Sequence, residues 1–179
     1  MADGTLKVGT ITTSSGSGTI TIPSGVNLTN NVPAFAAYLN SASHQFAENT
    51  WTKLQMYGED YDTDSAYDTS NGKFTIPTGA AGKYNFNIQA RTINNHTLRI
   101  IIALYKNGSA YSQQETRIAI GSGTTFPSVD LSVSLDCAAG DYFEAYAYHI
   151  NSGGDNGFQG SAASTDARKT YWSGYKIGA

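Results

Sequence analysis

Residues 67–86, YDTSNGKFTIPTGAAGKYNF, decide the fold class of this chain. The stretch holds two short runs of strand-forming residues separated by glycine-rich turns. It ends in a Gly-x-Tyr-x-Phe step at Gly82, Tyr84 and Phe86. β-Branched and aromatic residues between such turns are typical of antiparallel strands. The stretch carries no pattern of catalytic residues, so a binding or structural role is the first hypothesis.

The surrounding sequence repeats the same strand-and-turn pattern. Apolar and polar residues alternate in 84–90 and 129–136, which predicts strands with one buried face. In 98–105 both faces are apolar except at Arg99, so we expect this strand to be covered on both sides. Further strands are predicted at 33–39, 51–57, 73–77, 116–121, 142–150 and 170–177. No stretch has a helical period with caps, so the sequence predicts an all-β antiparallel jelly-roll sandwich.

Composition and charge exclude several classes of protein. Charged residues make up 14% of the chain, the net charge is −3, and no basic stripe is present, so no nucleic-acid partner is expected. No run approaches the ~20 apolar residues that a membrane span needs, and the first residues do not resemble a secretory signal. The single cysteine, Cys137, excludes an internal disulfide and is expected to pack at the end of strand 129–136.

The chain is predicted to have two parts. Residues 1–32 contain no aromatic residue and no histidine, and they alternate threonine with isoleucine or valine around Gly-Ser turns. Such a segment has too little apolar bulk to fold alone. We expect an extended N-terminal attachment segment that assembles against a partner chain or a larger assembly, with a disordered tail as the alternative. Residues 33–179 are predicted to form the β domain.

Several apolar residues fall opposite the predicted core face of their strands. They are Ile101 and Tyr105 on one strand, and Tyr146 and Tyr148 on another. Monomers rarely expose a large contiguous apolar patch, and tyrosine suits a contact that is apolar on the ring and polar at the tip. These four residues are therefore predicted to form a self-assembly interface, and scattered surface tyrosines are the alternative.

Five pieces of sequence, in order, carry a resemblance to a known family. They are PAFAA at 33–37, the spaced residues Tyr67, Asp68, Gly72, Phe74, Pro77, Gly82, Tyr84 and Phe86, LYKNG at 104–108, Leu135 with Gly140, Asp141 and Phe143, and WSGY at 172–175. Together they resemble the C1q-type head domain, a jelly roll related to the tumour-necrosis-factor fold, over 33–177. The collagen-like stalk of many members is absent, because residues 1–31 show no Gly-x-y period. The resemblance implies a homotrimer of jelly rolls that acts as a non-enzymatic binding head.

The N-terminal segment carries a second resemblance. Residues 4–31, with their GTITIPSG run, are similar to attachment segments of tailed-bacteriophage fibre and other virion proteins. This resemblance implies a structural protein located in the virion, joined to other virion proteins through residues 1–32. Two roles remain open: a receptor-binding head on a tail or fibre, and a capsid decoration or cement trimer.

Strand alternation predicts where a ligand site lies. The connections 92–97, 121–128 and 151–168, together with 58–70, are expected at one end of the domain, away from the attachment segment, and function usually lies on such loops. Aromatic and amide-bearing loop residues suited to a host-surface glycan or protein are the predicted ligand-binding set: His96, Phe126, Asp155, Asn156 and Phe158. The alternative is that these residues anchor the loops into the domain.

An acidic run raises the question of a metal. Asp60, Asp62 and Asp64 have the first, third and fifth spacing of a calcium loop. Ser65 replaces the turn glycine and Asn71 the closing glutamate, which excludes an EF-hand. Calcium binding and a solvated loop both remain open, and no other cofactor is expected.

Catalysis has little basis in the sequence. A glycosidase pairs two carboxylates, ~6.5–9.5 Å apart in inverting enzymes, and the candidate carboxylates all fall on predicted loops. No nucleophile elbow, phosphate loop or zinc pattern occurs. The chain is therefore predicted not to be an enzyme, and a capsule-degrading glycosidase is a remote alternative. The predicted core residues are Trp51, Phe74, Tyr84 and Phe86.

Overall fold

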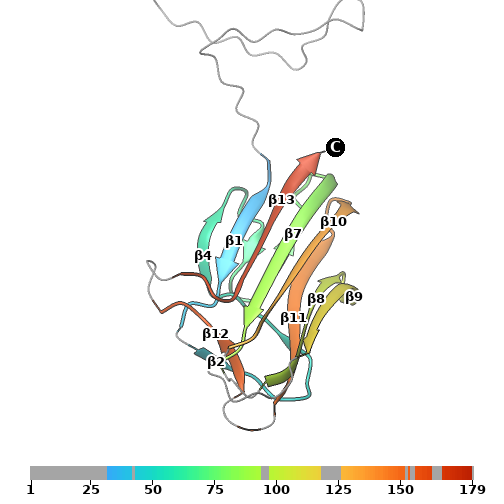
Figure 1. The fold of residues 1–179 in the computed structure, drawn as a ribbon. Helices are drawn as coiled ribbons and strands as arrows, with labels where there is room; N and C mark the ends of the chain where they lie inside the picture. Colours follow the sequence, from blue (N-terminus) through green and yellow to red (C-terminus); the bar gives the residue numbers. More distant parts are fainter. Residues whose placement is uncertain are drawn as a thin grey trace, which may run out of the picture. The chain divides into compact units, whose positions relative to one another are not determined.

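The computed structural model describes residues 32–41, 43–93, 97–117, 126–151, 153, 156–162 and 167–178. Within these ranges every regular element is a β-strand (Figure 1), which confirms the predicted fold class. None of the described segments forms a helix with the length and apolar character needed to cross a membrane. The predicted attachment segment falls almost wholly outside the described residues and stays a prediction.

The first layer is a five-stranded antiparallel sheet. Its order is β10 (Ser128–Cys137), β7 (Gly82–Arg91), β13 (Tyr171–Gly178), β1 (Ala34–Tyr38) and β4 (Gly58–Asp62). The first and last long strands of the domain, β1 and β13, therefore lie side by side in the middle of the sheet (Figure 1).

The second layer is a longer sheet that packs across the core. Its order is β5 (Tyr67–Asp68), β6 (Lys73–Thr75), β11 (Tyr142–Asn151), β8 (Thr97–Lys106) and β9 (Ser109–Arg117), and β3 (Thr52–Lys53) also pairs with β11. A separate two-stranded ribbon joins β2 (Ser43–Gln45) to β12 (Gly157–Gln159). This ribbon brings together two connections that the sequence places more than a hundred residues apart.

Aromatic rings fill the space between the sheets. Phe35 stacks on Phe74 with ring centroids 4.5 Å apart and meets Trp172 edge-on at 4.8 Å. Gly174 leaves room for the Phe86 ring, because a Cβ at this glycine would lie 2.5 Å from Phe86 Cδ1. Rings from both sheets therefore pack together and form the core of the domain.

Three of the four predicted core residues are confirmed, and one is wrong. Phe74, Tyr84 and Phe86 are fully buried, whereas Trp51 is 37% exposed. Trp51 precedes β3 and packs on the outer surface of the second sheet, while Leu54 fills the core nearby.

Strand β8 is covered on both faces, as its sequence predicts. Ile100, Ile102 and Leu104 point into the core and are completely buried. Ile101 and Ala103 lie on the opposite face and are buried as well, at 5% and 0% exposure. The outward face of β8 therefore has a cover of its own within the protomer.

Strand registers define two ends of the domain. Gly82 pairs with Cys137 at one end, which also holds the turn around Gly108; we call this the basal end. Arg91 pairs with Ser128 at the other, the distal end (lower part of Figure 1). The described parts of the connections that follow β7, precede β10 and follow β11 meet at the distal end, as predicted. The Thr92 NH donates to the Pro127 carbonyl (3.0 Å), and an isolated bridge joins Thr92 to Phe158.

The acidic segment is not at the distal end, so this part of the prediction is wrong. Residues 58–62 form strand β4, which pairs with β1 and places Asp62 opposite Phe35. The Thr63 hydroxyl donates to the carbonyl of Val32 (3.1 Å), and its backbone NH donates to that of Ala34 (3.0 Å). The segment thus runs back to the basal end, because it completes the first sheet as an edge strand. Acidic side chains on such an edge discourage pairing with another sheet.

Asp141 connects the two turns of the basal end. Its carboxylate accepts hydrogen bonds from the Lys106 ammonium (2.8 Å), the Asn107 side-chain amide (2.8 Å) and the Ala138 backbone NH (2.9 Å). Hydrogen bonds from Lys106 and then from Asn107 lower the pKa of Asp141 from 3.8 to about 2. Because the folded state holds the charged form more strongly than the unfolded chain does, this carboxylate stabilises the fold.

We expect Asp141→Asn to lower the free energy of unfolding by about 1–2 kcal/mol at pH 7. The native pKa lies below the unfolded value of 3.8, so the contribution is present above pH ~4 and lost as pH falls toward 2. Denaturant titrations at pH 7 and pH 2 check this. Asp130→Asn, an exposed position on β10, is the control and should change little at either pH. If Asp141→Asn lowered the free energy of unfolding as much at pH 2 as at pH 7, the stabilising role of the Asp141 carboxylate would be contradicted.

Candidate functional site

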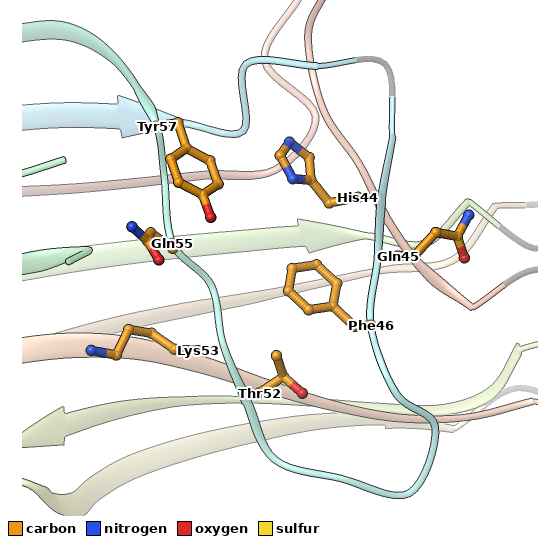
Figure 2. A pocket seen from close by; sticks show the side chains of 7 residues that line it. All are labelled: His44, Gln45, Phe46, Thr52, Lys53, Gln55 and Tyr57. Atoms are coloured by element: carbon orange, nitrogen blue, oxygen red, sulfur yellow. The ribbon is translucent and has the colours of Figure 1, made fainter. Parts of the chain in front are cut away.

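A pocket opens on the side of the domain, between β2 and the chain that leads from β3 to β4. Its volume is about 290 Å³, and the residues that line it are His44, Gln45, Phe46, Thr52, Lys53, Gln55 and Tyr57. Figure 2 shows the rings of His44, Phe46 and Tyr57 lying between the two chain segments. The size falls at the lower end of the range for small-molecule sites, roughly 300–1,000 Å³.

One wall comes from residues 52–57, which alternate without forming a continuous strand. Leu54 and Met56 are fully buried in the core. Lys53, Gln55 and Tyr57 therefore fall on the opposite side, where they line the pocket. The pairing of β3 with β11 and a hydrogen bond from the Leu54 NH to the Ala145 carbonyl (2.8 Å) hold this wall to the second sheet.

The other wall is aromatic and uncharged at neutral pH. The His44 ring stacks on Tyr57 with centroids 5.8 Å apart and planes 13° from parallel. The His44 ring also stacks on Phe46, with ring centroids 6.4 Å apart and planes 23° from parallel. The Ser41 hydroxyl lies 2.9 Å from His44 Nε2, and burial lowers the pKa of His44 below its ordinary value of 6.5. This shift favours the neutral imidazole, which stacks on Tyr57 as an aromatic ring.

The β2–β12 ribbon supports this wall from behind. Phe158 of β12 is fully buried, with its ring 5.5 Å from Phe46 and 5.5 Å from His149, which it meets edge-on. A Cβ at Gly157 would lie 1.9 Å from the His44 carbonyl oxygen, and the φ of Gly157 is +142°. Only glycine allows the ribbon to approach this closely.

Polar groups on the pocket wall are held in fixed orientations. Lys53 Nζ donates to Glu144 Oε1 (2.5 Å) and to the Asn71 carbonyl (3.1 Å), so its charge is paired. Gln55 Nε2 donates to the Ser70 carbonyl, which orients the side-chain amide. An amide whose NH₂ is engaged in this way presents its oxygen as an acceptor. The lining includes no carboxylate, so the pocket suits binding and gives no support to a two-carboxylate hydrolysis.

Three of the predicted ligand-binding residues lie in the described part of the chain, and they differ in exposure. Phe126 is 36% exposed, with the Arg91 guanidinium 5.7 Å from its ring. Asn156 is half-buried, and its side chain bonds to His149 and Asn151. Phe158 is completely buried, so its assignment as a surface ligand contact is wrong; pairing of β12 with β2 turns its ring into the core.

Two further members of that set, His96 and Asp155, lie outside the described residues. For them, as for Phe126, ligand binding remains a prediction. None of the described candidates lines the pocket, although Phe158 packs behind its Phe46 wall and the Asn156 carbonyl accepts a hydrogen bond from the Phe46 NH (3.3 Å).

The acidic run does not form a ligand cage. The Asp60 carboxylate pairs with the Arg168 guanidinium, whose carbon lies 3.4 Å from the centre of the Tyr38 ring. The two oxygens of Asp62 accept from the backbone NH groups of Asp64 (3.3 Å) and Tyr67 (2.7 Å). Among the described residues no group of three or more acidic, histidine or cysteine side chains could hold a metal ion. The calcium prediction therefore draws no support from the donor geometry.

The residues predicted to form an interface do gather on one surface. Tyr105 and Tyr146 have ring centroids 4.2 Å apart, and Trp51 lies 5.6 Å from Tyr148 and 6.4 Å from Tyr105. We call these four rings the aromatic cluster. The tyrosines are half-buried, and Tyr148 lies opposite Ile101 in register. Tyr146 lies opposite Ala103 in register, so the cluster lies on the same outward face as the buried Ile101 and Ala103 of β8.

Comparison with known proteins places the chain by its fold. No family model matches the sequence, and no curated protein matches it. Among solved structures, the globular domain of zebrafish complement 1qA protein has a TM-score of 0.58 at 16% identity, covering 81% of this chain and 97% of that one. Eiger TNF from S. frugiperda has a TM-score of 0.59 at 13% identity, covering 83% of this chain and 94% of that one. Murine APRIL has a TM-score of 0.56 at 9% identity, covering 82% of this chain and 99% of that one. These likenesses show a C1q/TNF-type jelly roll.

Proposed function

We propose that this protein is a non-enzymatic, homotrimeric binding head of a bacteriophage virion, carried on a tail or fibre, that contacts a glycan or protein of the host surface. The observation that carries the proposal is the C1q/TNF-type jelly roll with a pocket on its side and exposed rings on its outer sheet face. The virion location rests on the resemblance of residues 4–31 to phage attachment segments.

The aromatic cluster supports self-association. Trp51 is 37% exposed although it packs on two tyrosines, and half-exposed rings that are already ordered lose little entropy when a second surface covers them. In the proposed trimer, Ile101, Tyr105, Tyr146 and Tyr148 lie at or beneath the contact between copies.

The pocket supports a binding role over a purely structural one. A decoration trimer that clamps capsid subunits needs only its basal surface and residues 1–32. The pocket wall, by contrast, presents stacked rings and a paired lysine to an open cavity on the side of the domain. The decoration trimer remains the second candidate, because the attachment segment suits both locations.

Two measurements test the proposal. Sedimentation of the purified protein should give the mass of three chains, and a monomer at micromolar concentration would contradict the trimer. Imaging of the particle that contains this chain should place it on the tail or fibre in few copies. Hundreds of copies over the capsid would instead establish the decoration role.

A further inference from the structure

We propose that the pocket formed by β2 and residues 52–57 is a saccharide-binding site that takes one neutral pyranose ring, with the Tyr57 ring as its stacking platform. The inference rests on the proposed binding role and names its ligand class. It depends neither on the trimer nor on the position of the protein in a particle, because all of the lining comes from one protomer.

The Tyr57 ring provides the stacking platform of the pocket. A pyranose has one face of C–H groups, which is apolar, and an edge of hydroxyls. Tyr57 is 49% exposed, yet its ring is ordered by the nearly parallel His44 ring. His44 is in turn fixed by the Ser41 hydroxyl. A half-exposed ring beside a second, nearly parallel ring can take the C–H face of a sugar at little entropic cost.

The polar lining matches the hydroxyl edge. Gln55 offers an amide oxygen as an acceptor, Thr52 a hydroxyl, and Lys53 an ammonium that already bonds to Glu144 and Asn71. Sugar hydroxyls both donate and accept, so a mixed set of fixed acceptors and donors suits them. Polar and aromatic groups therefore converge on one small cavity, as in other sites for small ligands.

The charge of the pocket selects among sugars. Lys53 is the one cation of the lining, and Glu144 neutralises it at 2.5 Å. An acidic sugar would have to compete with Glu144 for this ammonium and would place its carboxylate near that of Glu144. A neutral hexose or N-acetylhexosamine avoids both costs. The volume of about 290 Å³ limits the enclosed part to a single ring, and the rest of a longer chain would extend into solvent.

Saturation-transfer NMR of the intact protein with the methyl glycosides of glucose, galactose, N-acetylglucosamine and glucuronic acid tests the site. We expect transfer to at least one neutral glycoside and weaker transfer to the glucuronide. Tyr57→Ala should weaken the binding of that glycoside about tenfold. Tyr57→Phe should retain the binding, because it keeps the ring.

Tyr111→Ala is the matched control, since Tyr111 is 52% exposed on β9 and lies outside the pocket lining. Gln55→Leu tests the polar contact independently of the ring and should also weaken binding. The inference is overturned if no neutral glycoside shows transfer, if Tyr57→Ala binds as Tyr111→Ala does, or if the glucuronide is preferred. Such failures leave the trimer mass and the particle position untouched, so they are separable from failure of the proposed function.

Discussion

Phe86→Ala is expected to destabilise the protein by about 3–5 kcal/mol. Phe86 is fully buried, with its ring centroid 4.6 Å from Phe143 and 5.9 Å from Phe74. Gly174, which lies opposite Phe86 in the register of β13 with β7, has no side chain that could fill the space left by the ring. The cavity left by the phenyl ring would therefore stay largely open, which places the cost in the upper range for such changes.

Denaturant unfolding at one fixed protein concentration measures this loss, since dissociation of an oligomer would otherwise contribute. Phe86→Leu should cost much less, because it fills most of the same volume. Tyr111→Ala, at an exposed position, should lie within about 0.5 kcal/mol of the unaltered protein. A loss below ~1 kcal/mol for Phe86→Ala would mean that the two sheets close around the missing ring.

Tyr146→Asp combined with Tyr148→Asp is expected to convert the proposed trimer to monomers. Both tyrosines belong to the aromatic cluster, and burial raises the pKa of Tyr146, with the Glu144 charge as the next cause. Two further carboxylates beside Glu144 would have to lose their hydration at a contact between copies. Such unpaired charges cost several kcal/mol each on burial, which exceeds what a standard interface can offset.

Sedimentation velocity of the double variant, with near-UV circular dichroism to show that the fold is intact, gives the readout. The matched control is Tyr61→Asp with Tyr175→Asp, a pair that is 50% and 44% exposed on strands β4 and β13 of the first sheet. The control should remain trimeric. Monomers from the control and trimers from Tyr146→Asp with Tyr148→Asp would move the interface to the first sheet.

Sequence patterns predict a long strand where the strand carries its own burial signal. Strand β9 (Ser109–Arg117) is largely exposed and has no such signal, so the strand predicted at 116–121 overlaps only its last two residues. In β10 the alternation of 129–136 is complete, and the structure buries the apolar side of nearly every pair. Strand β4 has no such signal, since GEDYD reads as an acidic loop. It forms because its backbone completes the edge of a sheet built by residues far away in the sequence. A local pattern cannot report a pairing that depends on a distant strand.

The pocket is not predicted, because it too depends on contacts between segments that have no shared local pattern. Its rings come from a three-residue strand and an irregular segment, and His44 and Tyr57 meet only because the chain between them turns back. The sequence does contain one usable signal: the alternation of Leu54 and Met56 with Gln55 and Tyr57 predicts an outward tyrosine. Phe158 is predicted to be an exposed ligand contact and is buried instead. A single aromatic residue in a glycine-rich segment gives no local sign of the β2–β12 pairing that buries it.

The close approach of the β2–β12 ribbon has a consequence for how this protein can evolve. Gly157 and Gly160 lie against backbone atoms of residues 39–45 at distances that exclude any side chain, so neither can change without displacing the wall. His44, Gln55 and Tyr57 have no such restriction, because they line a cavity open to solvent. Substitutions at these three lining residues can therefore change the properties of the pocket, while Gly157 and Gly160 preserve the backbone of its wall. Under the proposed binding role, related proteins with different ligands are expected to differ at His44, Gln55 and Tyr57 and to keep glycine at positions 157 and 160.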